Sequence, residues 1–134
     1  MLVASLAGVP ALAGKPPTLQ LHRTKLGSIL VNGQGYTLYT FSKDSRSHDA
    51  CVAISGCLSV WPALASSRPT AGSGVKHGLL GTIQVRGVGR QVTYAGHPLY
   101  TYVGDHHPGE TDNVNIYQSG GYWPAITAAG RAVK

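Results

Sequence analysis

The side chains that could do chemistry are gathered in two short stretches of the chain. All five acidic residues and three of the six histidines fall within residues 44–49 and 105–112. Mixed imidazole and carboxylate ligands suit Zn²⁺, Cu²⁺, Ni²⁺ or Fe, so these stretches predict a site for a divalent transition metal. The candidate ligands are Asp44, His48, Asp49, Asp105, His106, His107, Glu110 and Asp112.

The spacing of these residues selects no particular metal, because loops lack the fixed i, i+4 geometry of a helix. It matches neither a zinc finger nor the Ca²⁺ loop of an EF-hand. Asp44 and Asp105 also have a structural alternative. Each carboxylate can accept hydrogen bonds from backbone N–H groups of the following turn, or from a tyrosine hydroxyl that needs a buried partner.

Paired carboxylates can also catalyse hydrolysis. Two of them can share a proton, as in aspartic proteases, or flank a glycosidic bond. The residues around Asp44 and Asp105 lack the Asp-Thr/Ser-Gly loop of an aspartic protease. The chain has no Gly-x-Ser-x-Gly elbow, no His-Glu-x-x-His and no phosphate-cradling loop. We therefore predict no catalytic residues, and a hydrolase that uses the two aspartates is the second alternative.

An aromatic phrase that occurs twice leads into both acidic stretches. Its copies are Leu-Tyr-Thr-Phe-Ser-Lys-Asp at residues 38–44 and Leu-Tyr-Thr-Tyr-Val-Gly-Asp at residues 99–105, an offset of 61. Trp-Pro-Ala at residues 61–63 returns at residues 123–125, an offset of 62. Because two separate motifs recur at almost the same offset, the sequence indicates a tandem duplication of units of about 60 residues. Within one compact domain, we expect a linker and first strand over 14–25, repeat 1 over 26–75 and repeat 2 over 76–134.

The composition favours short strands over helices. The chain has 18 Gly and 8 Pro, and no stretch keeps a helical period over eleven or more residues. We therefore predict an all-β fold, with strands near residues 18–25, 28–31, 36–41, 81–86, 91–94, 99–103, 115–118 and 122–127.

The aromatic phrase predicts strands that are covered on both sides. Alternate side chains of a strand share a face, so Tyr39 and Phe41 point away from Leu38 and Thr40. The second copy repeats this alternation. One unit of about 60 residues buries too little surface alone. We therefore expect the two repeats to pack with pseudo-two-fold symmetry as a small sandwich or barrel-like domain.

Both the first residues and the cysteines suggest export. Residues 1–13 are apolar and end in Ala-Leu-Ala, a pattern that signal peptidase accepts, although the positive n-region is missing, as in a truncated start. The alternative is a disordered apolar tail, and the stretch is too short to span a bilayer. In an exported protein Cys51 and Cys57 are expected to form a disulfide, with a free pair or a metal-thiolate site as alternatives.

The net charge of +6 narrows the class of partner. The basic residues are scattered and form no known nucleic-acid signature, so nucleic acid is not the expected partner. An envelope protein or an anionic cell-surface polymer fits an exported basic protein better. No cofactor is predicted apart from the transition metal.

Several motifs resemble those of one bacterial family. Residues 39–44 and 100–105 are similar to the Tyr-x-(Phe/Trp/Tyr)-x-x-Asp motif of secreted repeats and predicted lipoproteins. The Cys…Cys…Trp-Pro segment at 51–62, the hairpin at 91–100 and the loop at 105–109 also match that family in order. The resemblance spans about residues 26–127.

The family is described as of unknown function, so the resemblance implies export to the periplasm, cell surface or medium and little more. The chain lacks the lipobox cysteine of the lipoprotein members. We predict an exported, non-catalytic module of the cell envelope or extracellular space. Its motif residues would mainly hold each hairpin and the loop after it: Tyr39, Phe41, Asp44, Trp61, Tyr100, Tyr102, Asp105 and Trp123.

Overall fold

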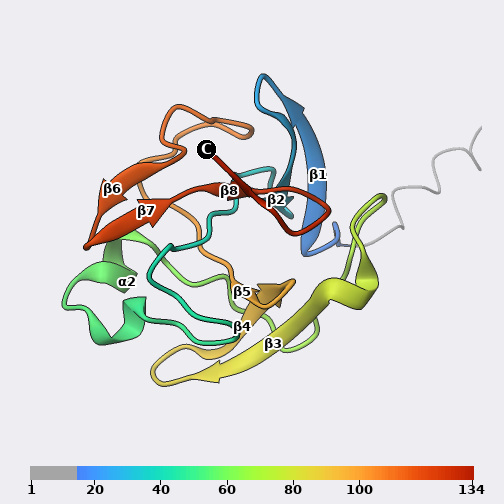
Figure 1. Ribbon diagram of the computed structural model, residues 1–134. Coiled ribbons are helices and arrows are strands. Elements are labelled where there is room, and N and C mark those ends of the chain that lie inside the picture. The colour runs from blue at the N-terminus through green and yellow to red at the C-terminus, as the bar shows by residue number, and fades with distance from the viewer. Residues whose placement is uncertain (1–14) are drawn as a thin grey trace, which may run out of the picture.

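The computed structural model describes residues 15–134, and the fold in this part of the chain is mostly β (Figure 1). The signal-peptide-like stretch predicted over residues 1–13 lies outside the described residues. The strands are β1 (Leu19–Thr24), β2 (Gly27–Asn32), β3 (Leu80–Val85), β4 (Gly89–Tyr94), β5 (His97–Pro98), β6 (Ile116–Gln118), β7 (Gly121–Trp123), β8 (Ala125–Ile126) and β9 (Ala132–Val133). Short helical turns are η2 (Cys51–Ala53), α2 (Cys57–Val60) and η3 (His77–Leu79).

The strands form four small antiparallel sheets. They are β1-β2, β3-β4-β5, β6-β7 and β8-β9. The β3–β4 hairpin was predicted and is confirmed, with Leu80 opposite Tyr94 and Val85 opposite Gly89. Gly87 and Gly89 have φ of 79° and 93°, which side chains with a Cβ rarely adopt, so glycine suits this tight turn.

Two expectations for the fold need correction. The class is mostly β rather than all-β, because the segment closed by the cysteines is too short for strands and forms helical turns instead. The barrel-like alternative is also wrong for the described residues, since the sheets are separate and do not close on one another. No helix among residues 15–134 is long and apolar enough to cross a membrane.

The two aromatic phrases do not form ordinary hairpins within their own repeats. The predicted hairpin of residues 28–31 with 36–41 is short. Asn32 N–H donates to the Tyr36 carbonyl at 2.8 Å, Val31 forms a bridge with Thr37, and Leu38 N–H donates to the Leu30 carbonyl at 3.1 Å. β2 pairs along its whole length with β1. After Leu38, the backbone N–H groups of Tyr39 and Thr40 donate to carbonyls of the other repeat.

The phrases of the two repeats pair with each other at their centres. Tyr39 N–H donates to the Tyr100 carbonyl at 2.8 Å, and Tyr100 N–H donates back to the Tyr39 carbonyl at 2.9 Å. The outer sides of both phrases are also reciprocal. Thr40 N–H donates to the Pro124 carbonyl and Thr101 N–H to the Pro62 carbonyl, each at 2.9 Å. Each phrase therefore pairs with the Trp-Pro-Ala segment of the other repeat.

Each phrase separates two hydrophobic clusters. One cluster is aliphatic and includes Leu38 and Leu99, which are fully buried. The other is aromatic, includes Tyr39 and Tyr100, and also holds both cysteines. The predicted alternation of faces is therefore confirmed, and the strand-like phrases are covered on both sides.

Candidate functional site

The polar groups of the two aromatic phrases bond to each other across the repeats. The Tyr39 hydroxyl donates to Asp105 Oδ2 at 2.7 Å, and the Tyr100 hydroxyl donates to Asp44 Oδ2 at 2.8 Å. Both tyrosine side chains are fully buried, so each hydroxyl needs a partner inside the protein. We call these the crossed pairs, because the tyrosine of each repeat bonds to the aspartate of the other.

Four aromatic rings stack beside the crossed pairs. The order is Phe41, Trp123, Trp61 and Tyr102, with centroids 4.0, 4.1 and 4.2 Å apart. The two indoles are nearly parallel, at 4°. Rings from the first and second repeats alternate along the stack. Separating the repeats would therefore expose all of these ring faces to water. The loss of buried apolar area and of the stacking contacts makes this separation unfavourable.

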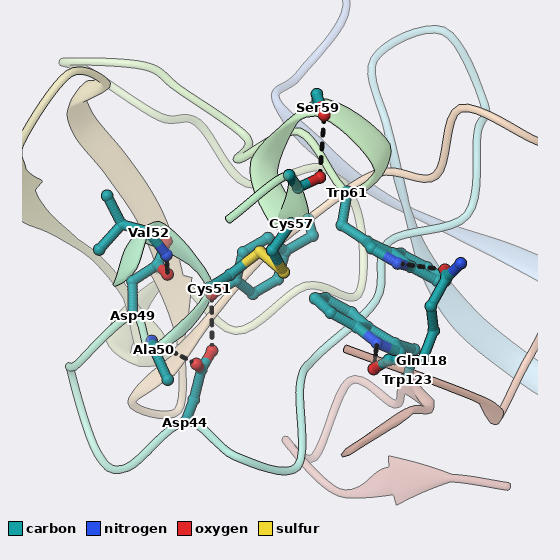
Figure 2. The surroundings of a disulfide bond; sticks show 12 residues. Asp44, Asp49, Ala50, Cys51, Val52, Cys57, Ser59, Trp61, Gln118 and Trp123 are labelled. Atoms are coloured by element: carbon teal, nitrogen blue, oxygen red, sulfur yellow. Dashed lines mark hydrogen bonds between the residues drawn. A yellow bond between two sulfur atoms is a disulfide. The ribbon is translucent and has the colours of Figure 1, made fainter. Parts of the chain in front are cut away.

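One glutamine satisfies both buried indoles (Figure 2). Trp61 Nε1–H donates to Gln118 Oε1 at 2.8 Å, and Trp123 Nε1–H donates to the Gln118 carbonyl at 3.0 Å. The sequence predicts that a buried indole needs an acceptor, but it carries no signal that identifies Gln118. This residue is a part of the site that sequence reasoning missed.

The loop after the first phrase is held by a disulfide and by carboxylates that cap backbone N–H groups. The Cys51–Cys57 disulfide is confirmed, with Cα atoms 5.4 Å apart. Asp44 Oδ1 accepts from Ala50 N–H at 2.7 Å, and Asp49 Oδ1 accepts from Val52 N–H at 2.9 Å (Figure 2). Asp44 therefore joins the disulfide loop to Tyr100 of the second repeat.

The loop after the second phrase has no disulfide and is held by hydrogen bonds. Two of them come from or go to the other repeat: Gly109 N–H donates to the Gly35 carbonyl at 2.9 Å, and the Thr37 hydroxyl donates to the Glu110 carbonyl at 2.6 Å.

Asn113 Nδ2 donates to Asp105 Oδ1 at 2.8 Å and to Glu110 Oε2 at 3.3 Å. Glu110 Oε1 accepts from the backbone N–H groups of His106, at 2.8 Å, and His107, at 3.3 Å. Asn113 was also missed from the sequence, where it is one polar residue among several.

Burial sets the protonation of both crossed pairs. It raises the pKa of Asp44 to about 7, against the opposing hydrogen bonds from Ala50 and Tyr100 and with a further rise from the charge of Asp49. Burial also raises the pKa of Asp105, which bonds from Asn113 and Tyr39 oppose. For Tyr39 and Tyr100 burial is again the main cause of a raised pKa, so both phenols stay neutral donors.

The candidate metal ligands do not gather in one place. Among residues 15–134 no group of three or more His, Cys, Asp or Glu side chains could hold a metal ion. Asp49 and Asp105 are buried, at 4% and 8% exposure. The three loop histidines, His48, His106 and His107, are exposed. Asp112 is exposed and lies 4.0 Å from Lys25. Asp44, Asp105 and Glu110 each accept hydrogen bonds from protein groups.

Asp44 and Asp105 do not open into a shared cavity in the way a hydrolase needs. Asp44 lines a cavity of about 450 Å³ together with Ser42, His97 and Tyr122, and Asp105 is not among its lining residues. The pKa of His97 is lowered, mainly by burial and also by the nearby Arg46. Each aspartate instead has its own tyrosine as hydrogen-bond donor.

The comparison with protein families agrees with the repeat architecture. The model of a family described as a secreted repeat of unknown function matches residues 21–65 and again residues 80–127. The two matches together cover more than half of the chain. The chain belongs to this secreted-repeat family. Its description supports an exported protein, and the tandem duplication predicted from the sequence is confirmed.

Two further comparisons add nothing to the assignment. Neither the curated proteins nor the solved structures include a significant match to the chain. The matched segments of the secreted-repeat family contain both aromatic phrases and both Trp-Pro-Ala segments. They therefore include the crossed pairs and the aromatic stack.

Proposed function

We propose that this secreted repeat protein is a non-catalytic module of the cell envelope or extracellular space, and that its motif residues clamp the two repeats together. The observation that carries the proposal is the crossed pairing of Tyr39 with Asp105 and of Tyr100 with Asp44. The groups that could act as acid, base or ligand bond to one another inside the protein. A buried hydroxyl and carboxylate that satisfy each other are structural partners.

The reciprocal contacts support a pseudo-two-fold arrangement of the repeats. The backbone pair of Tyr39 and Tyr100 lies at the centre, with the crossed pairs on either side. The stack repeats the relation, since Phe41 lies on Trp123 as Tyr102 lies on Trp61. A hydrolase has less support, because it would need both aspartates at one accessible cleft.

The proposal is tested by a double-mutant cycle on each crossed pair. Tyr39→Phe and Asp105→Ala form one cycle, and Tyr100→Phe and Asp44→Ala form the other. Each single change leaves a buried polar group without its partner, so we expect a loss of about 1–3 kcal/mol in the free energy of unfolding. The two changes of a cycle should couple by about 0.5–3 kcal/mol. Denaturant unfolding with and without chelator gives the measurement.

Tyr117→Phe is the matched control for these variants, because the Tyr117 side chain is 62% exposed. It should change stability by less than about 0.5 kcal/mol. Additive losses in both cycles would contradict the clamp, and so would a loss that chelator abolishes. A stably folded Asp44→Asn, Asp105→Asn double variant that loses a hydrolytic activity of the parent would revive the enzyme alternative.

A further inference from the structure

The fold places the basic side chains at the surface and most of the acidic side chains in the interior. All eleven lysine and arginine side chains are exposed. Asp49 and Asp105 are buried, and Asp44 is partly buried against Tyr100. Only Glu110 and Asp112 remain near the surface as carboxylates free of the crossed pairs. The surface is therefore more cationic than the net charge of +6 indicates.

Arginines are brought together at one end of the molecule. Arg86 and Arg90 flank the β3–β4 turn, and the 3.0 Å bond from Ser66 N–H to the Arg90 carbonyl places the segment that leads to Arg68 beside them. Arg86 also lines a shallow cavity of about 130 Å³ with Ser47, His48 and the buried Asp49. Arg46 does not join this group, because its guanidinium bonds to the Ala95 carbonyl at the opposite end of β4. We call Arg68, Arg86 and Arg90 the basic end.

The basic end lies far from the exposed carboxylates. In Figure 1 the β3–β4 turn is at the bottom, whereas the orange loop that precedes β6 and holds Glu110 and Asp112 is at the top. Within the described part of the chain, the one ion pair joins Lys25 to Asp112. The three guanidinium groups of the basic end thus form no ion pair with a carboxylate among residues 15–134. Unpaired arginines grouped at one end attract anions and orient them.

The chemistry of the basic end selects the kind of anion. Arginine presents a planar fork of N–H donors that matches the paired oxygens of phosphate and carboxylate groups. The two exposed tyrosines that could stack on nucleobases, Tyr117 and Tyr122, lie on the separate β6–β7 hairpin. Recognition of single-stranded nucleic acid ordinarily combines basic groups with such stacking rings. The basic end therefore offers contacts to repeated phosphates and none to bases.

We propose that the basic end binds a linear anionic polymer of the cell surface that carries repeated phosphate groups. This inference rests on the proposed function in one respect, that the protein is exported. It does not depend on the clamp, because none of the three arginines takes part in a crossed pair. Several spaced phosphates on one chain can engage several guanidinium groups together, which a single phosphate ion cannot do.

The test is binding of long-chain polyphosphate to the full protein over a series of salt concentrations. The variant Arg86→Glu, Arg90→Glu reverses two charges at the β3–β4 turn. The matched control Arg23→Glu, Lys25→Glu reverses two exposed charges at the β1–β2 turn. We expect about ten-fold weaker binding for the first variant and less than about three-fold for the second. The slope of log affinity against log salt should fall by about 1.4, at roughly 0.7 per contact.

Three outcomes would overturn the inference. Equal losses in the two variants would mean that net charge alone attracts the polymer. Tighter binding of duplex DNA or of anionic lipid vesicles than of polyphosphate would assign the surface to another partner. If polyphosphate does not bind even at low salt, the proposed site does not exist. If the glutamate variant fails to fold, Arg86→Gln, Arg90→Gln replaces it. The Tyr39→Phe variant should bind polyphosphate like the parent, so failure of the clamp is distinguished from failure of this site.

Discussion

The two acidic loops hold the same kind of aspartate by different means. Asp44 accepts from a backbone N–H inside a loop that the Cys51–Cys57 disulfide closes. Asp105 accepts from the side chain of Asn113, in a loop with no covalent link. Both carboxylates then accept from a tyrosine hydroxyl of the other repeat, at 2.8 and 2.7 Å. The contact between repeats is thus the same on both sides, and only its local support differs.

The difference indicates what each part of the repeat does. The aromatic phrase and the Trp-Pro-Ala segment make reciprocal contacts across the molecule, so a change in one requires a matching change in the other. The loops beyond the aspartates are not reciprocal: the first contains a disulfide, and the second bonds to Gly35 and Thr37 of the other repeat. They can therefore diverge, provided that each still presents its carboxylate to the opposite tyrosine.

The largest expected effect tests whether the two repeats contribute equally to the aromatic stack. Trp61→Ala and Trp123→Ala each remove a fully buried indole and its three ring contacts, two stacked and one edge-on. We expect each to lower the free energy of unfolding by about 3–5 kcal/mol. Chemical denaturation measures both. The exposed Tyr117→Ala serves as control, and a large loss in only one tryptophan variant would show that the stack belongs to one repeat.

Removing the disulfide should destabilise the first acidic loop more than the second. Cys51→Ala with Cys57→Ala releases a short closed loop, which is expected to cost about 2–3 kcal/mol, mostly by freeing the unfolded chain. Hydrogen exchange should become faster at Ala50 and Val52, whose N–H groups bond to Asp44 and Asp49. Exchange at His106, which bonds to Glu110, should change less. Equal acceleration in both loops would argue against local support.

Lowering the pH should raise the contribution of Asp44 to the free energy of unfolding. With a pKa of about 7 in the folded protein and an ordinary value near 3.9 when unfolded, Asp44 binds its proton more tightly in the native state between these pH values. The free energy of unfolding should therefore fall as the pH rises from about 4 to about 7. His97, with its lowered pKa, contributes in the opposite direction. The difference between the parent and Asp44→Asn isolates the aspartate.

That comparison uses guanidinium chloride midpoints measured at several pH values. The parent should lose its advantage over Asp44→Asn as the pH rises through 7. Asp105 contributes with the same sign, because its pKa is also raised by burial. A difference between parent and variant that grows with pH would mean that Asp44 is held ionised, and the account of its burial would then be wrong.

The smallest expected effect concerns metal. The metal-binding alternative assigns ligands to loops 44–49 and 105–112, and in the second loop His106 and His107 are exposed. If the crossed pairs are purely structural, chelator should change neither the native mass spectrum nor the unfolding midpoint. Loss of a stoichiometric metal mass on chelation would contradict this. Destabilisation by chelator that His106→Ala, His107→Ala removes would then assign the site to the second loop.

Local patterns predicted the parts of this fold that local interactions decide. The alternation of Leu38 and Tyr39 gave the two faces of the phrase correctly, since side-chain direction in an extended chain follows the backbone alone. The cysteine spacing and the glycines between β3 and β4 were equally local signals. The predicted resemblance to secreted repeats was also confirmed.

The partners of these elements could not be predicted in the same way. The hydrophobic pattern around Tyr39 is satisfied equally by a strand of its own repeat or of the other, so the exchange between repeats left no local trace. The acidic loops suggested a metal because their residues are close in sequence. Folding turns Asp49 and Asp105 inward and leaves His48 and His106 outside. Proximity in sequence did not translate into a shared centre.

The exchange of pairing partners between the repeats has a consequence for how such a chain can be divided. Cutting the backbone between them would leave two pieces, each with unpaired edges and half of the ring stack exposed. Each piece is the natural complement of the other, so they should reassemble when mixed, as split proteins do. A gene for one repeat would by the same geometry specify a dimer. Fusing two copies turns that encounter into one within a single molecule, at the high effective concentration that a short tether provides.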